Sequence, residues 1–147
     1  MSYGRWGRIS IVTGSNPTTG SESQYVIPST SIFKIKSIHL TMDASSGSSG
    51  TARSPYIEIT GSTGLSLFKV YSGKDYSSGS GTTEYYWISG LGDSSSFTGS
   101  GLAVKPFPID VMLDSGYVIR TNTTNFDDED NWSYPIIFVE EWMKDSV

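Results

Sequence analysis

The sequence predicts an all-β chain, an eight-stranded antiparallel sandwich of the jelly-roll type. Ser, Thr and Gly are abundant, and they disfavour helices because they compete with helical hydrogen bonds or lose more entropy on ordering. Short apolar segments alternate with turn-rich linkers, and no stretch shows the 3.6-residue period of an amphipathic helix. Long connections in the middle of the chain favour Greek-key crossings over a simple meander.

The first predicted strand, residues 6–13, alternates loosely between apolar and polar side chains. A loop follows at residues 14–20, where the Asn16-Pro17 pair is a strong turn signal. We assign residues 1–31 to an N-terminal strand and extended arm, and residues 32–147 to the sandwich, the two together forming one domain.

Residues 32–42 predict a long strand with a change of parity in its middle. Phe33 and Ile35 share one parity, whereas Ile38 and Leu40 share the other. Such a switch is expected where one extra residue is inserted, so we predict a β-bulge near Lys36-Ser37.

Residues 56–60 and 65–71 predict a hairpin, because the four residues between them, 61–64, form a compact Gly-containing connection. Residues 82–89 are rich in strand formers and predict the next strand. Residues 43–54 are mostly Ser, Gly and Thr, so we expect them to form an exposed loop.

Residues 107–113 and 117–121 flank Asp114-Ser115-Gly116 and predict the clearest hairpin of the chain. An acidic loop at residues 123–133 separates this hairpin from a closing strand at residues 135–142. These segments bring the expected strands to eight.

Composition excludes several classes of protein. The chain of 147 residues contains no Cys, so packing and hydrogen bonds must stabilise it, and its 13% aromatic content offsets a modest apolar fraction of 36%. No segment is long and apolar enough to span a membrane or to act as a signal peptide, so we expect synthesis in a host cytoplasm and no membrane partner. The net charge of −5 disfavours nucleic acid as a partner.

The charge is uneven along the chain. Residues 1–42 hold four basic side chains and one acidic one, whereas residues 127–147 hold seven acidic side chains and one lysine. These two regions can complement each other between subunits, or they can serve only to keep the protein soluble.

Catalytic chemistry has few candidates. His39 is the single histidine, and its neighbours Ile38 and Leu40 take the core parity, so we expect it to face solvent or a subunit contact. Asp110 and Asp114 lie at a spacing that puts two carboxylates on one face of a strand, as a glycoside hydrolase would need. We expect these two acids to be solvated instead, and we predict no enzyme activity and no cofactor.

A metal site has one weak candidate, the acidic loop. Asp127, Asp128 and Asp130 offer carboxylate oxygens of the kind that calcium prefers, but the spacing differs from that of an EF-hand loop. The alternative is a solvated loop at the rim, and we predict no metal.

Recognition of another surface is the function that this composition favours. Trp6 lies between Arg5 and Arg8 and resembles an anchoring arm, while residues 85–87, Tyr-Tyr-Trp, place rings on both faces of one strand. We therefore predict an interface with another protein surface or another subunit that includes Arg5, Trp6, Arg8, Tyr86 and Trp132.

Several segments carry a family resemblance. Residues 106–121 combine an apolar strand, a Gly-containing turn and a strand ending in Arg, residues 128–133 form an acidic loop, and residues 137–142 end in Val-Glu-Glu-Trp. Residues 37–41 and 57–60 complete the pattern in the first half. This arrangement resembles small jelly-roll structural proteins of tailed bacteriophages.

The resemblance implies a virion structural protein, a capsid cement or decoration protein on the capsid surface. Its expected partners are the major capsid protein and further copies of itself, as a homotrimer. The alternative is a tail or fibre module that binds a receptor or a carbohydrate, with Tyr86 and Trp87 as stacking platforms.

Overall fold

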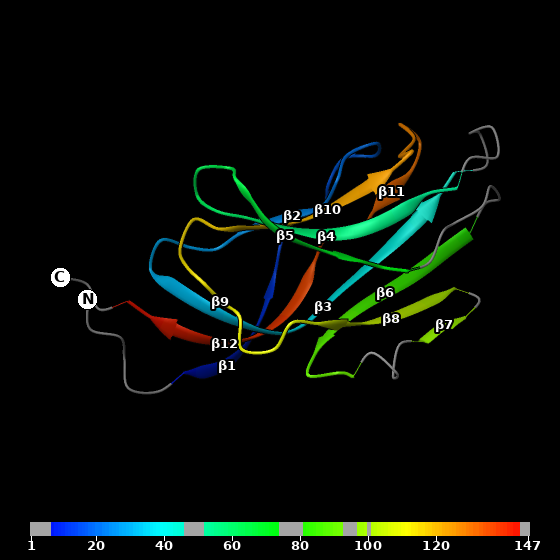
Figure 1. Ribbon diagram of the computed structural model, residues 1–147. Coiled ribbons are helices and arrows are strands. Elements are labelled where there is room, and N and C mark those ends of the chain that lie inside the picture. Colours follow the sequence, from blue (N-terminus) through cyan, green and yellow to red (C-terminus); the bar gives the residue numbers. More distant parts are fainter. Residues whose placement is uncertain (1–6, 46–51, 74–80, 93–96, 100, 145–147) are drawn as a thin grey trace.

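The computed structural model describes residues 7–45, 52–73, 81–92, 97–99 and 101–144. In these residues the chain forms strands and no helix, arranged as two packed sheets (Figure 1). None of the described residues belongs to a helix that could cross a membrane. The all-β sandwich that the sequence predicts is confirmed.

The larger sheet has eight strands and contains both the first and the last of the described elements. Its main path runs β1-β12-β3-β6-β8-β7, with the short strands β9 and β11 also paired to β3. The bounds are β1 Arg8–Thr13, β3 Ser31–Ala44, β6 Gly81–Ser89, β7 Phe97–Gly99, β8 Leu102–Phe107, β9 Met112–Leu113, β11 Asn131–Trp132 and β12 Ile136–Met143. All of its pairs are antiparallel except β6 with β8, which is parallel.

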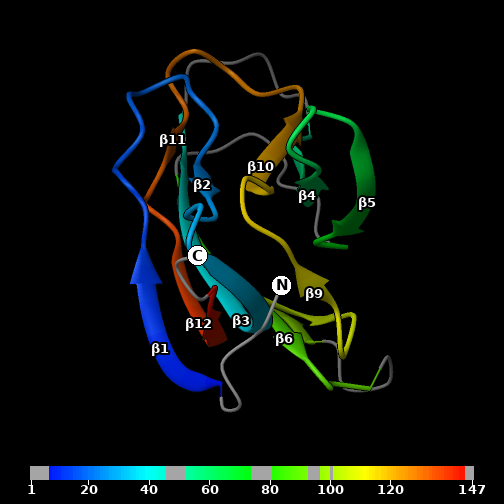
Figure 2. The ribbon, with the colours of Figure 1, turned by 90° about the vertical axis from the view of Figure 1, so that its left-hand side faces the viewer.

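The smaller sheet has four antiparallel strands in the order β2-β10-β4-β5. They are β2 Gln24–Val26, β4 Ser54–Thr60, β5 Ser66–Tyr71 and β10 Val118–Thr124. Figure 2 shows this sheet facing the larger one, and shows the segment after β1 rising and crossing to β2. Residues 8–26 therefore contribute one edge strand to each sheet.

The core lies between the two sheets, where alternate residues of facing strands meet. Aliphatic side chains dominate the smaller sheet's inner face, and large rings from β6 and β11 fill the larger sheet's side. The fully buried members of the core include Ile38, Leu40, Ile57, Ile59, Tyr85, Trp87, Trp132 and Ile137.

The predicted bulge in β3 is confirmed. Ile35 pairs with Val139 and Ser37 pairs with Phe138, so Lys36 is the extra residue of β3. The insertion keeps Ile35 and Ile38 both buried although they are three positions apart, an odd spacing that would otherwise put them on opposite faces. Without it, one half of this long strand would turn its apolar side chains to solvent.

Two predictions about strands need correction. Twelve strands occur in the described residues, where eight were expected, because short pieces such as β2 and β11 carry no alternation of their own. The hairpin expected from residues 107–113 and 117–121 is wrong: β9 pairs with β3 in the larger sheet, whereas β10 pairs with β4 and β2 in the smaller one. The turn at Asp114–Gly116 thus carries the chain from one sheet to the other.

The hairpin of β4 and β5 is confirmed, and its turn offers a test of backbone strain. Gly64 has φ +83°, and a Cβ placed on it would meet no atom within 4 Å. Gly64→Ala should therefore destabilise the protein by about 1 kcal/mol through the left-handed backbone alone. Chemical denaturation measures this loss, and an unchanged midpoint would contradict the assigned turn.

Candidate binding surfaces

The outer face of the larger sheet carries a row of apolar side chains across its strands. Because residues directly opposite each other in paired strands share a face, the register places them together. On β1 and β12, Ile11 pairs with Phe138. Across the next strands, Ile136 of β12 pairs with His39 of β3, His39 pairs with Tyr86 of β6, and Tyr86 pairs with Val104 of β8. We call this set the outer apolar face: Ile9, Ile11, Ile136, Phe138, Tyr86 and Val104.

Its members at the β1 side are strongly exposed. Ile11 is 68% exposed, Ile9 59% and Phe138 39%. The intervening residues Ile137 and Val139 of β12 point inward and are fully buried, so the alternation of the strand assigns Phe138 to the outer side. Clustered exposure of large apolar side chains on a folded protein is typical of a binding surface.

His39 and Tyr86 form the centre of this face. Their rings stack with centroids 4.2 Å apart and planes 8° from parallel. Burial lowers the pKa of His39, although the Glu84 carboxylate opposes this, so the ring is neutral at pH 7. The pair therefore extends the apolar face and adds no cation to it. His39 faces outward, as the parity of Ile38 and Leu40 predicts.

Charged side chains border the face at both ends. At one end Lys36 pairs with Glu140 at 3.3 Å, and Lys34 pairs with Asp110. At the other end lie Glu84, whose carboxylate is 3.4 Å from the Tyr86 hydroxyl, and Asp43. An apolar centre with a polar border is the usual composition of a protein–protein interface.

The predicted interface residues occupy different environments. Tyr86 lies on the outer apolar face, and Arg5 and Trp6 lie outside the described residues. Arg8 is exposed, but its guanidinium donates to Glu141, 2.9 Å from Nε and from Nη2 to Oε2. Ser31 donates to the other oxygen of this buried carboxylate at 2.7 Å. Arg8 therefore stabilises an acid of the inner layer and does not extend the outer face.

Trp132 is a correction, since its side chain is fully buried. Its ring packs against that of Tyr85 with centroids 5.5 Å apart, and its Nε1–H donates to Thr123 Oγ1 at 3.3 Å. Trp87, expected as a stacking platform for sugars, is also fully buried. Both rings belong to the core because β6 and β11 present them to the smaller sheet.

The acidic loop is organised around a buried ion pair. Asp130 and Arg53 both have fully buried side chains, and Arg53 Nε donates to Asp130 Oδ2 at 2.5 Å. The backbone amides of Ser45 and Asp127 donate to the same carboxylate at 2.8 and 2.9 Å. Asp130 thus ties the acidic loop to two other segments and has no free oxygen to offer a cation.

Asp130 is therefore removed from the three acidic residues that the sequence offers as weak candidates for a metal site. Asp127 accepts a hydrogen bond from the amide of Glu129, and Asp128 is exposed beside it. Across the part of the chain that the structure describes, no three His, Asp or Glu side chains gather closely enough to hold a metal ion.

Asp110 and Asp114, which the sequence offers as a catalytic pair, take part in two different ion pairs. Asp110 contacts Lys34, and Asp114 contacts Lys144 at 2.5 Å. Hydrogen bonds from these lysines lower the pKa of both carboxyls, so both are ionised at neutral pH. Neither has the raised pKa that a general acid of a glycosidase needs.

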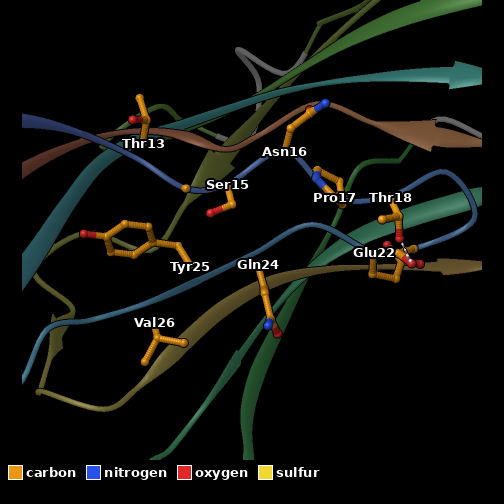
Figure 3. Close-up of a pocket in the computed structure, with 11 residues that line it drawn as sticks. Thr13, Ser15, Asn16, Pro17, Thr18, Glu22, Gln24, Tyr25 and Val26 are labelled. Atoms are coloured by element: carbon orange, nitrogen blue, oxygen red, sulfur yellow. Dashed lines mark hydrogen bonds between the residues drawn. The ribbon is translucent and has the colours of Figure 1, made fainter.

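A polar pocket opens between the loop after β1 and strand β2 (Figure 3). Its volume is about 590 Å³. In Figure 3 the ring of Tyr25 lies between the two chain segments, while Gln24 and Val26 extend to the opposite side of β2. Sequence reasoning missed this pocket, because the loop carries only turn signals and β2 is too short to be recognised.

Glu22 is the one acidic side chain that lines this pocket. Burial raises its pKa, against hydrogen bonds that favour the ionised form. One of these bonds comes from the Thr123 hydroxyl, 3.3 Å from Oε2. The carboxyl group is therefore held in position by β10 rather than free in solvent.

Comparison with family models, with curated proteins and with solved structures gives no match to this chain.

Proposed function

We propose that this chain is a structural protein that binds the surface of another protein through its outer apolar face. In the form that the sequence resemblance implies, it is a virion cement or decoration protein, and its partner is the major capsid protein. The observation that carries this proposal is the exposure of Ile9, Ile11 and Phe138 on one face of a rigid sheet.

The size of the face bears on how it can work. Five neighbouring strands at a spacing of about 4.8 Å span about 19 Å, and three alternate residues along a strand add about 14 Å, which gives about 270 Å². A stable interface buries about 800 Å² on each partner. The outer apolar face is therefore the centre of a larger contact, to which the bordering charges Lys36, Glu140 and Glu84 contribute a polar rim.

Energetics favour attachment at more than one point. Burial of this whole footprint would contribute at most about 7 kcal/mol even if all of it were apolar. This is comparable with the cost of about 4–15 kcal/mol for immobilising two proteins. One copy alone then binds weakly, whereas a homotrimer presents three such faces, and its second and third contacts form at high effective concentration.

Cementing follows from this arrangement. A protein that binds only the assembled lattice stabilises that lattice by mass action, because rupture must first release it. The two-sheet framework suits this role, since its strands already hold the apolar side chains in one plane. Little conformational entropy is then lost when the face binds its partner.

The test compares two equally exposed apolar side chains. Ile11 on the outer apolar face and Leu65 in the β4–β5 turn are each 68% exposed. The binding partner is a preparation of purified virus heads (capsids) from which the protein is missing. Ile11→Asp should lower the affinity for these heads at least about tenfold, because it places a charge in the contact. Leu65→Asp should bind as the unmodified protein does, and co-sedimentation measures both.

Further measurements complete the design. Light scattering should give the mass of a trimer for the unmodified chain, and added protein should raise the temperature at which the heads release their DNA. Ile11→Asp should keep the thermal midpoint of the protein itself within a few degrees, since the side chain is exposed. Equal binding of Ile11→Asp and Leu65→Asp would refute the outer apolar face as the contact.

A further inference from the structure

The polar pocket between the loop after β1 and strand β2 shares no residue with the outer apolar face, although Thr13, which lines the pocket, pairs with Ile136 of that face. Its lining consists mainly of hydroxyl and amide side chains, together with one carboxylate and one aromatic ring. The residues that carry the argument are Ser15, Asn16, Thr18, Glu22, Gln24 and Tyr25. We infer that this pocket binds a neutral saccharide.

The chemistry of the lining selects this class of ligand. Hydroxyls of Ser15 and Thr18 can both donate and accept, and the amide of Asn16 presents a donor beside an acceptor. The amide of Gln24 offers the same pair on the other side of β2, where it also lines a second hollow. Adjacent hydroxyl groups of a sugar ring offer the same paired pattern. The Glu22 carboxylate adds acceptors only, and Tyr25 supplies an apolar ring against which the C–H face of a sugar can pack.

Tyr25 is prepared for such a contact. Its ring stacks on Phe33 with centroids 5.9 Å apart and planes 22° from parallel. This core residue supports the ring from one side, and Figure 3 shows the ring reaching between the two segments that form the pocket. A ring fixed in this way loses little entropy when a ligand packs on it.

Other ligand classes fit less well. None of the residues that line this pocket is basic, and Arg120, in the adjoining hollow, already pairs with Glu58 at 2.5 Å, so the site has little to attract an anion. A single carboxylate is too few for a metal ion. A lysine side chain from a partner would leave most of about 590 Å³ unfilled, whereas this volume is usual for a site that binds a small molecule.

A second, smaller hollow continues the site. It measures about 150 Å³, shares Glu22 and Gln24 with the first pocket, and is also lined by Ser23, Arg120 and Asn122. The two shared residues and Asn122 give a second set of polar contacts, so we expect an oligosaccharide to bind more tightly than a single sugar.

The experiment is an amide chemical-shift titration of the full ¹⁵N-labelled chain. The probes are maltotriose, chitotriose and lactose, with Nα-acetyl-lysinamide and inorganic phosphate as counter-probes. At least one saccharide should shift amides of residues 14–26 and 120–122, with a Kd of about 1 mM or below. The matching monosaccharide should bind more weakly.

Two variants locate the contact. Glu22→Gln keeps the size of the side chain and removes acceptors, and Gln24→Ala removes an amide that both hollows share. Each should raise the Kd at least fivefold, while Thr63→Ala, in the exposed β4–β5 turn, should leave it unchanged. Thermal midpoints of all three confirm that the fold is intact.

The outcomes separate clearly. Shifts caused only by Nα-acetyl-lysinamide or phosphate, saccharide shifts outside these residues, or no response to any saccharide at about 20 mM, far above a Kd of 1 mM, each overturn the inference. Because Ile11 does not line the pocket and Gln24 does not belong to the outer apolar face, Ile11→Asp should keep saccharide binding and Gln24→Ala should keep binding to heads. A failure of one proposal is thereby distinguished from a failure of the other.

Discussion

Asp130→Ala should destabilise the protein by about 3–5 kcal/mol, because it removes the carboxylate that pairs with the buried Arg53 guanidinium. The change also removes the acceptor for the amides of Ser45 and Asp127. For a chain of this length the thermal midpoint should fall by about 10 °C. Asp128→Ala, in the exposed neighbour, should change stability by no more than about 0.5 kcal/mol.

A double variant sharpens this prediction. Arg53→Met combined with Asp130→Leu removes both charges, so no uncompensated ion remains and the loss should be smaller than that of Asp130→Ala alone. Urea denaturation of the single and double variants measures the coupling. A loss below about 1 kcal/mol for Asp130→Ala would show that Arg53 finds other partners.

The same pair predicts how stability depends on pH. Burial disfavours the ionised form of Asp130, but hydrogen bonds from Arg53 and from the amides of Asp127 and Ser45 outweigh it, and the pKa lies below its usual 3.8. The stabilisation is therefore complete above the unfolded pKa and is lost as the pH falls through the native pKa. Asp130→Asn should flatten the acid limb of the stability curve below about pH 4.

Trp132→Ala should cost about 3–5 kcal/mol, the usual loss when a large aromatic side chain is removed from a core. The cavity would expose one side of Tyr85 and leave the Thr123 hydroxyl without its donor. Trp132→Phe should cost less, because most of the volume remains while the hydrogen bond is lost. Denaturation followed by tryptophan fluorescence measures both.

This variant also decides between two roles for Trp132. If Trp132 is a core residue, Trp132→Ala lowers stability and leaves head binding intact at temperatures where the variant is folded. If Trp132 is an interface residue, the substitution weakens head binding and leaves stability unchanged. Weak binding by a fully stable Trp132→Ala protein would restore the surface role that the sequence predicts.

Strand formation could be predicted from local patterns where a strand is long. The parity switch around Lys36 identified the bulge of β3, and the Gly-containing connection at residues 61–64 identified the β4–β5 hairpin. The segment at residues 107–113 misled because its apolar character continues through a turn, in which Asp110 takes φ +60°. Pairing across the sandwich depends on distant partners, and the local pattern of a hairpin does not contain them.

The binding surface was harder to predict for a related reason. Ile9 and Ile11 share a parity, as core residues do, yet they face outward, and the inner position next to them belongs to Val12. The assumption that the apolar side of a strand is buried fails where that side is a binding surface. Tyr86 was recognised because its strand carries rings on both sides, and only one side can be core.

The position of β12 has a consequence for how the molecule is made. This strand lies between β1 and β3, so an interior place in the larger sheet is filled by the segment that is synthesised after all the others described. Until β12 leaves the ribosome, β1 has no neighbour to pair with and the long strand β3 keeps an open edge. Closure must therefore wait until all the other described strands have been made, with few local pairings to speed it. Nascent chains are then most vulnerable to edge-to-edge aggregation shortly before synthesis of this region ends.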